Sequence, residues 1–237
     1  IIGSIADDGT ITYSDLAING RNSYPAHSNG HYFTVLGELD AGGRNLKLES
    51  GAKMIIKETG SVVAGSMTLG HNTAGTYYGL IEMTGGSLTT GTITLNQNHA
   101  NDISISGGVL EFTNATVINR GSNTNTTITI GGTSDGATVT LKATSTDWTL
   151  NGSGLAKAPT IKNVTIDSAN THGITLQNVS LNGVITNDAT LNLAGFTVAA
   201  NTTASISGTG TTTLIGTVTN NGTLTAGGTV AVAENTT

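Results

Sequence analysis

The chain has 237 residues, a formal net charge of −6 and only 10 % charged residues, against about 25 % in ordinary globular proteins. Its nine lysines and arginines are scattered and form no basic stripe, so we expect neither nucleic acid nor an anionic membrane surface as a partner. No run of 18 apolar residues is present, and we therefore expect no membrane insertion of this segment.

The remaining composition favours an exported, folded chain. Hydrophobic residues make up 36 % of the sequence and alternate regularly with Ser, Thr, Asn and Gly, which argues against disorder. Cysteine is absent, as is common in bacterial exported proteins that need no disulfides. The chain starts at Ile1 without an initiator methionine or a visible signal peptide, which indicates a piece of a longer protein.

Residues 1–45 are the least repetitive segment. Expected strands lie at residues 11–13 and 32–36, with turns at residues 19–20 and 29–30. We predict that this segment is a cap covering the first repeat, and a segment that joins subunits is the alternative. Residues 46–237 are predicted to form the repetitive domain.

One pattern is written twice between residues 80 and 117. Residues 81–88 read IEMTGGSL and residues 103–110 read ISISGGVL, 22 positions later, and the same offset maps Leu95 onto Val117. Apolar residues alternate with polar ones, and a glycine pair follows at the same phase. Short strands and glycine turns repeating about every twenty residues predict an all-β parallel β-helix (β-solenoid), with about eleven coils of about 20–24 residues.

The pattern continues less regularly towards the C-terminus. The next coil is expected at residues 128–132, and residues 151–159 are expected to form a longer loop with Pro159 at a strand start or turn. Residues 163–166 resemble residues 178–181 at a spacing shorter than one coil, so this match is expected to join different sides of neighbouring coils. The last copy, residues 218–224, leaves an open strand edge near Thr237.

Three acidic residues are the first candidate site. Asp147, Asp167 and Asp188 follow one another at nearly equal spacings of about one expected coil, and they could stack in one column. Active sites of β-helix enzymes require such clustered carboxylates, and a column would raise the pKa of its members or recruit a cation. A parallel basic column is conceivable at Arg120, Lys142 and Lys162. We favour the alternative that turns of different length scatter these residues.

Other motifs for chemistry are missing from the sequence. The five histidines, of which His27 and His31 are the nearest pair, form no zinc set, and no calcium-binding nonapeptide or nucleotide fingerprint is present. We therefore predict no catalytic residue, no metal and no cofactor. Three aromatic residues are candidate sugar platforms: Tyr77, Tyr78 and Trp148.

Residues 218–228, VTNNGTLTAGG, resemble the passengers of bacterial autotransporters and haemagglutinin-like adhesins. Residues 107–110 with Asn119 are similar in style, as is the whole of residues 46–237. The resemblance implies a right-handed parallel β-helix exported to the bacterial cell surface. The translocating β-barrel and export signal of that family are not found in this sequence.

These observations predict a non-enzymatic extracellular β-solenoid that is structural or adhesive. The rod is expected to project from the surface and to associate head-to-tail with itself into filaments, with host or cell-surface glycans or proteins as further partners. One alternative is a polysaccharide lyase or hydrolase resembling phage tailspikes, with the acidic column as its site. Another is a glycan-binding module that uses the aromatic platforms.

Overall fold

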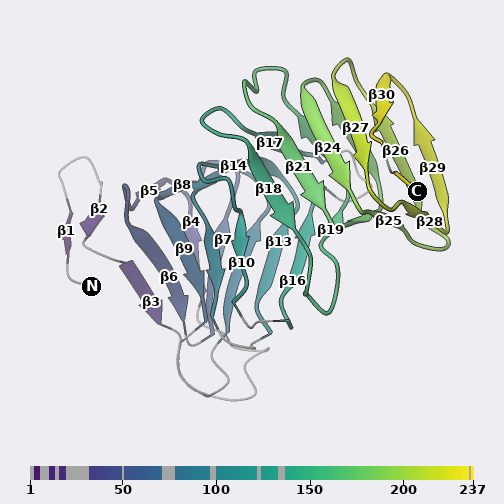
Figure 1. The fold of residues 1–237 in the computed structure, drawn as a ribbon. Coiled ribbons are helices and arrows are strands. Elements are labelled where there is room, and N and C mark those ends of the chain that lie inside the picture. Colours follow the sequence, from purple (N-terminus) through teal and green to yellow (C-terminus); the bar gives the residue numbers. More distant parts are fainter. Residues whose placement is uncertain are drawn as a thin grey trace.

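In the computed structural model, the described residues are 3–5, 11–13, 16–19, 32–49, 51–70, 78–96, 100–121, 124–132, 137–234 and 236–237. Within them the chain is all-β and contains no helix. Short strands stack in parallel into a solenoid of about eight turns (Figure 1). The predicted parallel β-solenoid is confirmed, and the hand of the coil stays a prediction.

Each turn contributes one strand to each of three faces. The first face consists of β4 (Tyr32–Val35), β7 (Ala52–Ile56), β10 (Gly79–Met83), β13 (Asp102–Ile105), β16 (Thr127–Ile130), β19 (Thr160–Ile161), β22 (Ser180–Leu181), β25 (Thr197–Val198) and β28 (Thr219–Asn220). The second face consists of β5 (Glu38–Asp40), β8 (Ser61–Ala64), β11 (Ser87–Thr90), β14 (Gly108–Phe112), β17 (Val139–Lys142), β20 (Val164–Ile166), β23 (Val184–Asn187), β26 (Thr203–Ser207) and β29 (Thr223–Ala226).

The third face is divided into two parts. Its N-terminal part consists of β3 (Leu16–Asn19), β6 (Asn45–Glu49), β9 (Ser66–Leu69), β12 (Ile93–Leu95) and β15 (Ile118–Asn119). Its C-terminal part consists of β18 (Trp148–Asn151), β21 (Ile174–Gln177), β24 (Thr190–Ala194), β27 (Thr211–Ile215) and β30 (Thr229–Val232).

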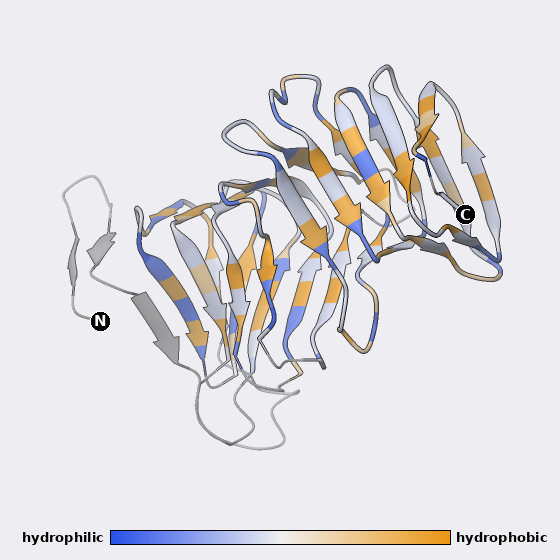
Figure 2. Cartoon of the chain, viewed as in Figure 1, coloured by the Kyte–Doolittle hydropathy of each residue, from blue (hydrophilic) through white to orange (hydrophobic). Residues whose placement is uncertain are grey.

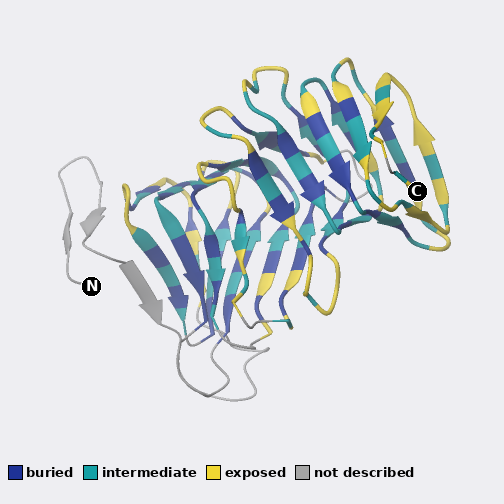
Figure 3. Cartoon of the chain, in the orientation of Figure 1, coloured by how far each residue is buried: buried dark blue, intermediate teal, exposed yellow. Residues whose placement is uncertain are grey.

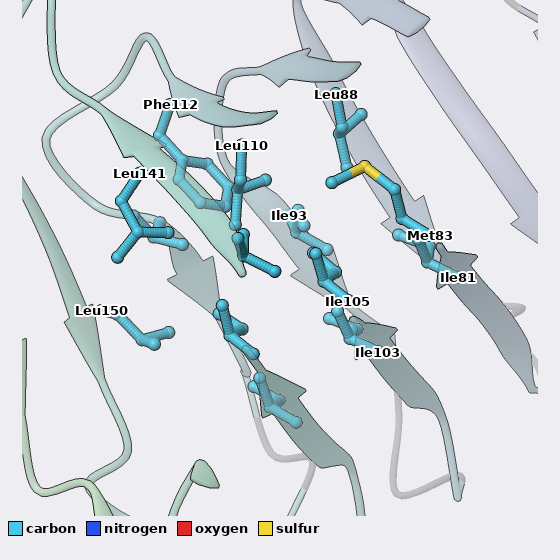
Figure 4. Packing of buried hydrophobic residues seen from close by; sticks show 14 of the residues in the cluster. Ile81, Met83, Leu88, Ile93, Ile103, Ile105, Leu110, Phe112, Leu141 and Leu150 are labelled. Carbon is cyan, nitrogen blue, oxygen red and sulfur yellow. The ribbon is translucent and has the colours of Figure 1, made fainter. Parts of the chain in front are cut away.

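Period-two alternation explains why these segments stack. Ile81 pairs with Ile103, and Ile103 with Ile128, so that one buried side chain lies above another on successive coils. Figure 4 shows this column beside the inward residues of the second face, and Figure 2 shows the apolar positions crossing the strands as bands. Burying each such side chain stabilises the fold by about 1.5–3 kcal/mol. The predicted register of the double repeat is therefore confirmed.

The glycine pairs mark the corner between the first and second faces. Gly86 and Gly108 have φ values of +68° and +89°, a region that residues with a Cβ rarely adopt. A Cβ on Gly86 would overlap the carbonyl oxygen of Gly60, and one on Gly108 would overlap that of Gly86. Corner backbones thus approach one another so closely that only glycine fits.

Coil length varies more than the sequence predicts. The coil from Leu181 to its partner Val198 is much shorter than the coil from Ile130 to its partner Ile161. Because several coils are longer than expected, the chain makes about eight turns and not eleven. At about 4.8 Å per strand, the stack is roughly 40 Å long. The predicted pairing of Leu95 with Val117 is wrong, because extra residues in the turn after β14 bring Ile118 opposite Ile93.

Strands within residues 1–45 already take part in the stack. β3, β4 and β5 pair in parallel with β6, β7 and β8. β1 (Gly3–Ile5) and β2 (Ile11–Tyr13) form a separate antiparallel pair. The stacked faces therefore reach back beyond the predicted boundary at residue 46, and the capping or joining role of this segment stays a prediction.

The two parts of the third face meet at a weak junction. No sheet pairing joins β15 to β18 in the described residues, and a single bridge between Thr116 and Thr149 connects the two coils on this face. The rings of Phe112 and Trp148 pack edge to face across the same junction, with centroids 5.3 Å apart and planes at 69°. The strands β21, β24 and β27 are offset from β6 and β9 in Figure 1.

Later sequence matches are also placed by the fold. β19 starts directly after Pro159, as predicted for a residue that cannot donate to a sheet. Of the two similar segments around residues 163–166 and 178–181, one forms β20 on the second face and the other leads into β22 on the first face. The expected placement on different sides of neighbouring coils is confirmed.

Candidate functional site

The three candidate aspartates lie at turns between the second and third faces but do not form one column. Asp167 follows β20 and Asp188 follows β23, so these two occupy equivalent positions on successive coils. The position equivalent to Asp167 on the preceding coil is taken by Lys142, whose Nζ lies 3.9 Å from Oδ2 of Asp167. Asp147 lies at the other end of its turn, directly before β18.

Two of these carboxylates, Asp167 and Asp188, accept hydrogen bonds from residues in turns. Asp167 accepts one from the amide of Ala169 at 2.9 Å. Asp188 accepts bonds from the amide and hydroxyl of Thr209 at 2.9 and 3.0 Å. These bonds fix turns, which is an ordinary use of Asp in connecting segments.

The basic residues are also separated by the fold. Arg120 follows β15 on the third face, Lys142 ends β17 on the second face, and Lys162 follows β19 on the first face. The conceivable basic column is therefore not formed.

Burial excludes two of the three residues that were predicted to stack against sugars. Trp148 is only 2 % exposed, and its indole N–H donates to the carbonyl of Lys142 at 2.7 Å. Tyr78 is 9 % exposed and packs against Gly51. Neither ring offers an open face on which a sugar could stack, and both are removed as candidates. Tyr77 lies outside the described residues.

An open hollow of about 260 Å³ lies on the outer surface where the second face turns into β18, β21 and β24. It is lined by Asp147, Asn170, Thr171, His172, Gly173, Thr175, Thr190 and Asn192. Sequence spacing missed this set, because its members come from three coils of unequal length.

A glycine in an outward-facing column lies among the residues that line the hollow. Trp148, Ile174 and Leu191 are register partners on successive strands, so the residues that precede them, Asp147, Gly173 and Thr190, also follow one another along the stack. A Cβ placed on Gly173 would lie 3.7 Å from Oδ1 of Asp147 and 3.7 Å from Cγ2 of Thr190. The missing side chain therefore leaves a gap between the carboxylate and the threonine.

Hydrogen bonds hold the walls of the hollow in place. The amide of Gly173 donates to Oδ1 of Asp147 at 2.7 Å. Asn170 accepts from the amide of Ala143 at 2.9 Å and donates to the carbonyl of Leu141 at 3.1 Å, which ties the turn after β20 to the preceding coil. The polar groups of the hollow thus sit on a pre-organised backbone.

Thr171 links the ring of His172 to the preceding coil. The hydroxyl of Thr171 donates its proton to the carbonyl of Thr144 at 3.1 Å, and it lies 3.0 Å from Nδ1 of His172. In the tautomer that carries its proton on Nδ1, the ring donates to this hydroxyl and Nε2 is the hydrogen-bond acceptor. The other four histidines lie outside the described residues.

Three charged residues gather on the outer side of the first face, a cluster that the sequence spacing also missed. Lys53 on β7 forms an ion pair with Glu82 on β10, and Asp102 on β13 is the register partner of Leu80, which pairs with Lys53. Asp102 is exposed as a whole residue, but partial burial of its carboxyl raises the pKa above its ordinary value of 3.8; Lys53 opposes the rise and Glu82 adds to it.

We expect the substitution Asp102→Asn to stabilise the protein at neutral pH. Since the folded pKa lies above the unfolded one, the folded chain binds more protons between the two values, and wild-type stability falls as the pH rises through that window. The amide that replaces the carboxyl does not titrate, so the gain should be present at pH values above the window and disappear below pH 3.8. Urea denaturation across this range measures it.

Two results would check the causes given for the raised pKa of Asp102. Glu82→Gln removes the neighbouring negative charge and should narrow the pH window of Asp102. A variant Asp102→Asn that is less stable than wild type at neutral pH would show that attraction by Lys53 outweighs burial.

Two further classes of site are absent from the described part of the chain. No three His, Asp or Glu side chains there gather in a way that could hold a metal ion. No helix with the length and hydropathy needed to cross a membrane occurs among the same residues.

Comparison with known proteins gives no relative from which a function could be transferred. No protein-family model matches the chain, and neither a curated protein nor a solved structure gives a significant match.

Proposed function

We propose that this chain is a non-enzymatic structural and adhesive β-solenoid, displayed as a rigid rod outside a bacterial cell. The observation that carries the proposal is the use of the candidate carboxylates: Asp167 and Asp188 are engaged in turn hydrogen bonds, and Asp167 also lies beside Lys142. Because these residues serve the architecture of the coil, the outer surface is left for display and contact.

The extracellular, bacterial location is part of the same proposal. It is supported by the absence of cysteine and by the resemblance of residues 218–228 to autotransporter passengers and haemagglutinin-like adhesins. A stack of two nine-stranded faces suits such a role, because each coil is supported by its neighbours and the length can grow without a larger core.

We further propose that the rod associates end to end. β28, β29 and β30 are the last strands of their faces, and Figure 3 shows many exposed positions on β29 and β30. Val232 is 66 % exposed although it pairs with Leu214, a residue that packs against the core. Unpaired edges with apolar side chains accept a further coil, and we assign that coil to a second copy of the chain, bound through its N-terminal end.

Replacing Val232 by Lys should weaken this association by at least about tenfold. An ammonium group buried without a partner at the end face costs more than the ~1.4 kcal/mol that corresponds to a factor of ten. Light scattering against protein concentration, with negative-stain images of filament length, measures the effect. Thr165→Lys is the matched control, since Thr165 faces outward from β20 in the middle of the rod.

Equal filament formation by wild type and Val232→Lys would contradict end-to-end stacking. Release of reducing ends or unsaturated products from polysaccharides would contradict the non-enzymatic proposal, and loss of that release in Asp167→Asn would assign it to the acidic residues.

A further inference from the structure

We propose that the hollow above Gly173 binds one uncharged sugar unit at the end or branch of a glycan. The inference rests on the proposed adhesive function and deepens it by naming the class of partner and the place where it binds. Its starting point is the gap in the outward column, where Gly173 lies between Asp147 and Thr190.

The size of the hollow fits a single ring. Its volume is about 260 Å³. Pockets for drug-sized ligands begin at about 300 Å³. One pyranose ring is therefore a better match than a longer chain, and the open side lets the rest of the glycan extend into solvent.

The hydrogen-bonding groups suit sugar hydroxyls. Asp147 has one oxygen fixed by the Gly173 amide, and no described residue donates to its second oxygen. The His172 ring has one nitrogen beyond the contact with Thr171, and this nitrogen accepts in one tautomer and donates in the other. Asn192 donates its amide N–H to Thr175 at 3.3 Å and retains its carbonyl oxygen. Vicinal hydroxyls donate to acceptors of this kind.

The charge of the hollow excludes other ligand classes. None of the eight described residues that line it is Lys or Arg, and Asp147 would repel a uronic acid, a sulfated sugar or a phosphate. A divalent cation would find one carboxylate among otherwise neutral groups, short of the several oxygen ligands it needs. A neutral polyol satisfies the acceptors without burying a charge.

The hollow is also pre-organised, which lowers the cost of binding. Asn170 clamps the turn after β20 to the coil below, and the amide of His172 donates to the carbonyl of Ala143 at 3.1 Å. Walls fixed by backbone hydrogen bonds lose little conformational freedom when a ligand is bound.

Titration of the folded chain with neutral hexoses, N-acetylglucosamine and galacturonic acid, followed by protein NMR, tests the site. We expect at least one neutral sugar to bind with a Kd on the order of 1 mM, with shifts at Gly173 and its neighbours, and galacturonic acid to bind more weakly.

Two variants should weaken that binding by about tenfold or more. Gly173→Ala places a methyl group between Asp147 and Thr190, where a sugar ring would lie, while its new Cβ makes only ordinary contacts at 3.7 Å, so folding should be kept. Asp147→Asn removes the charged acceptor, a loss of about this size for a hydrogen bond to a charged group. Asp188→Asn is the matched control, because it removes the same charge from a turn outside the hollow and should bind as wild type does.

Unchanged sugar binding in both Gly173→Ala and Asp147→Asn would overturn the inference, as would the absence of any shift with all neutral sugars or a preference for galacturonic acid. These outcomes leave end-to-end association and the lack of catalysis untouched. Cleavage of a glycan that still binds at Gly173 would overturn the proposed non-enzymatic function and leave the sugar site standing.

Discussion

Trp148→Ala is expected to lower the free energy of unfolding by about 3–5 kcal/mol, the range found when large aromatic side chains are removed from cores. Trp148 is 2 % exposed and packs edge to face on Phe112. Little else should compensate for this loss, because a single bridge between Thr116 and Thr149 joins the backbones of the two coils on the third face in the described residues. Chemical denaturation followed by circular dichroism measures it.

Trp148→Phe is the matched control. Phenylalanine keeps most of the buried area and the contact with Phe112, but the carbonyl of Lys142 loses the indole N–H at 2.7 Å. We expect a smaller loss of about 1–3 kcal/mol, as for a buried acceptor left without its partner. An alanine variant no less stable than the phenylalanine variant would show that the ring does not hold the junction.

Gly86→Ala should destabilise the protein by at least about 2 kcal/mol, because a strained φ and a steric overlap add together. The φ is +68°, which costs roughly 1–2 kcal/mol for a residue with a Cβ. The new Cβ would also overlap the carbonyl oxygen of Gly60, which accepts the amide of Ser87 at 2.9 Å, so this backbone bond must move as well. Thermal unfolding compared with wild type gives the effect.

Gly43→Ala provides the comparison for this prediction. Gly43 has no atom within 4 Å of an added Cβ and does not have a positive φ. We expect its replacement to leave stability unchanged or to raise it slightly, since alanine reduces the conformational freedom of the unfolded chain. Equal losses at Gly43 and Gly86 would mean that close corner approach is not what the glycine pair provides.

The stacking of the double repeat can be predicted because two independent signals agree there. The alternation around Ile81 and Ile103 fixes which face is buried, and the glycine pairs fix the corner, so register follows from sequence spacing. Leu95 carries no second signal. The turn after β14 lengthens and contains the buried apolar Val117, which gave the false match, and the true partner of Ile93 is Ile118.

The burial of Trp148 is encoded in the phase of its strand. Trp148 and Leu150 lie on the same side of β18, so a buried Leu150 requires a buried Trp148. A lone tryptophan among small polar residues favours a surface role when it is considered by its type alone. The alternation along the strand is the better guide.

The sugar-sized hollow cannot be predicted from spacing. Gly173 matters because Asp147 precedes it by one coil and Thr190 follows it by one coil, although these two coils differ in length. Asp147, Asp167 and Asp188 show the converse. Their even spacing in the sequence matches the average coil length. Because the turns differ in length, however, Asp147 lies directly before β18, whereas Asp167 and Asp188 lie directly after β20 and β23.

The divided third face has a mechanical consequence. A stack that is pulled at its two ends should break first where, in the described residues, one of its three faces is joined only by the backbone bridge between Thr116 and Thr149 and by the packing of Phe112 on Trp148. The molecule would then extend as two stiff blocks released in one step, with the break between Thr116 and Thr149.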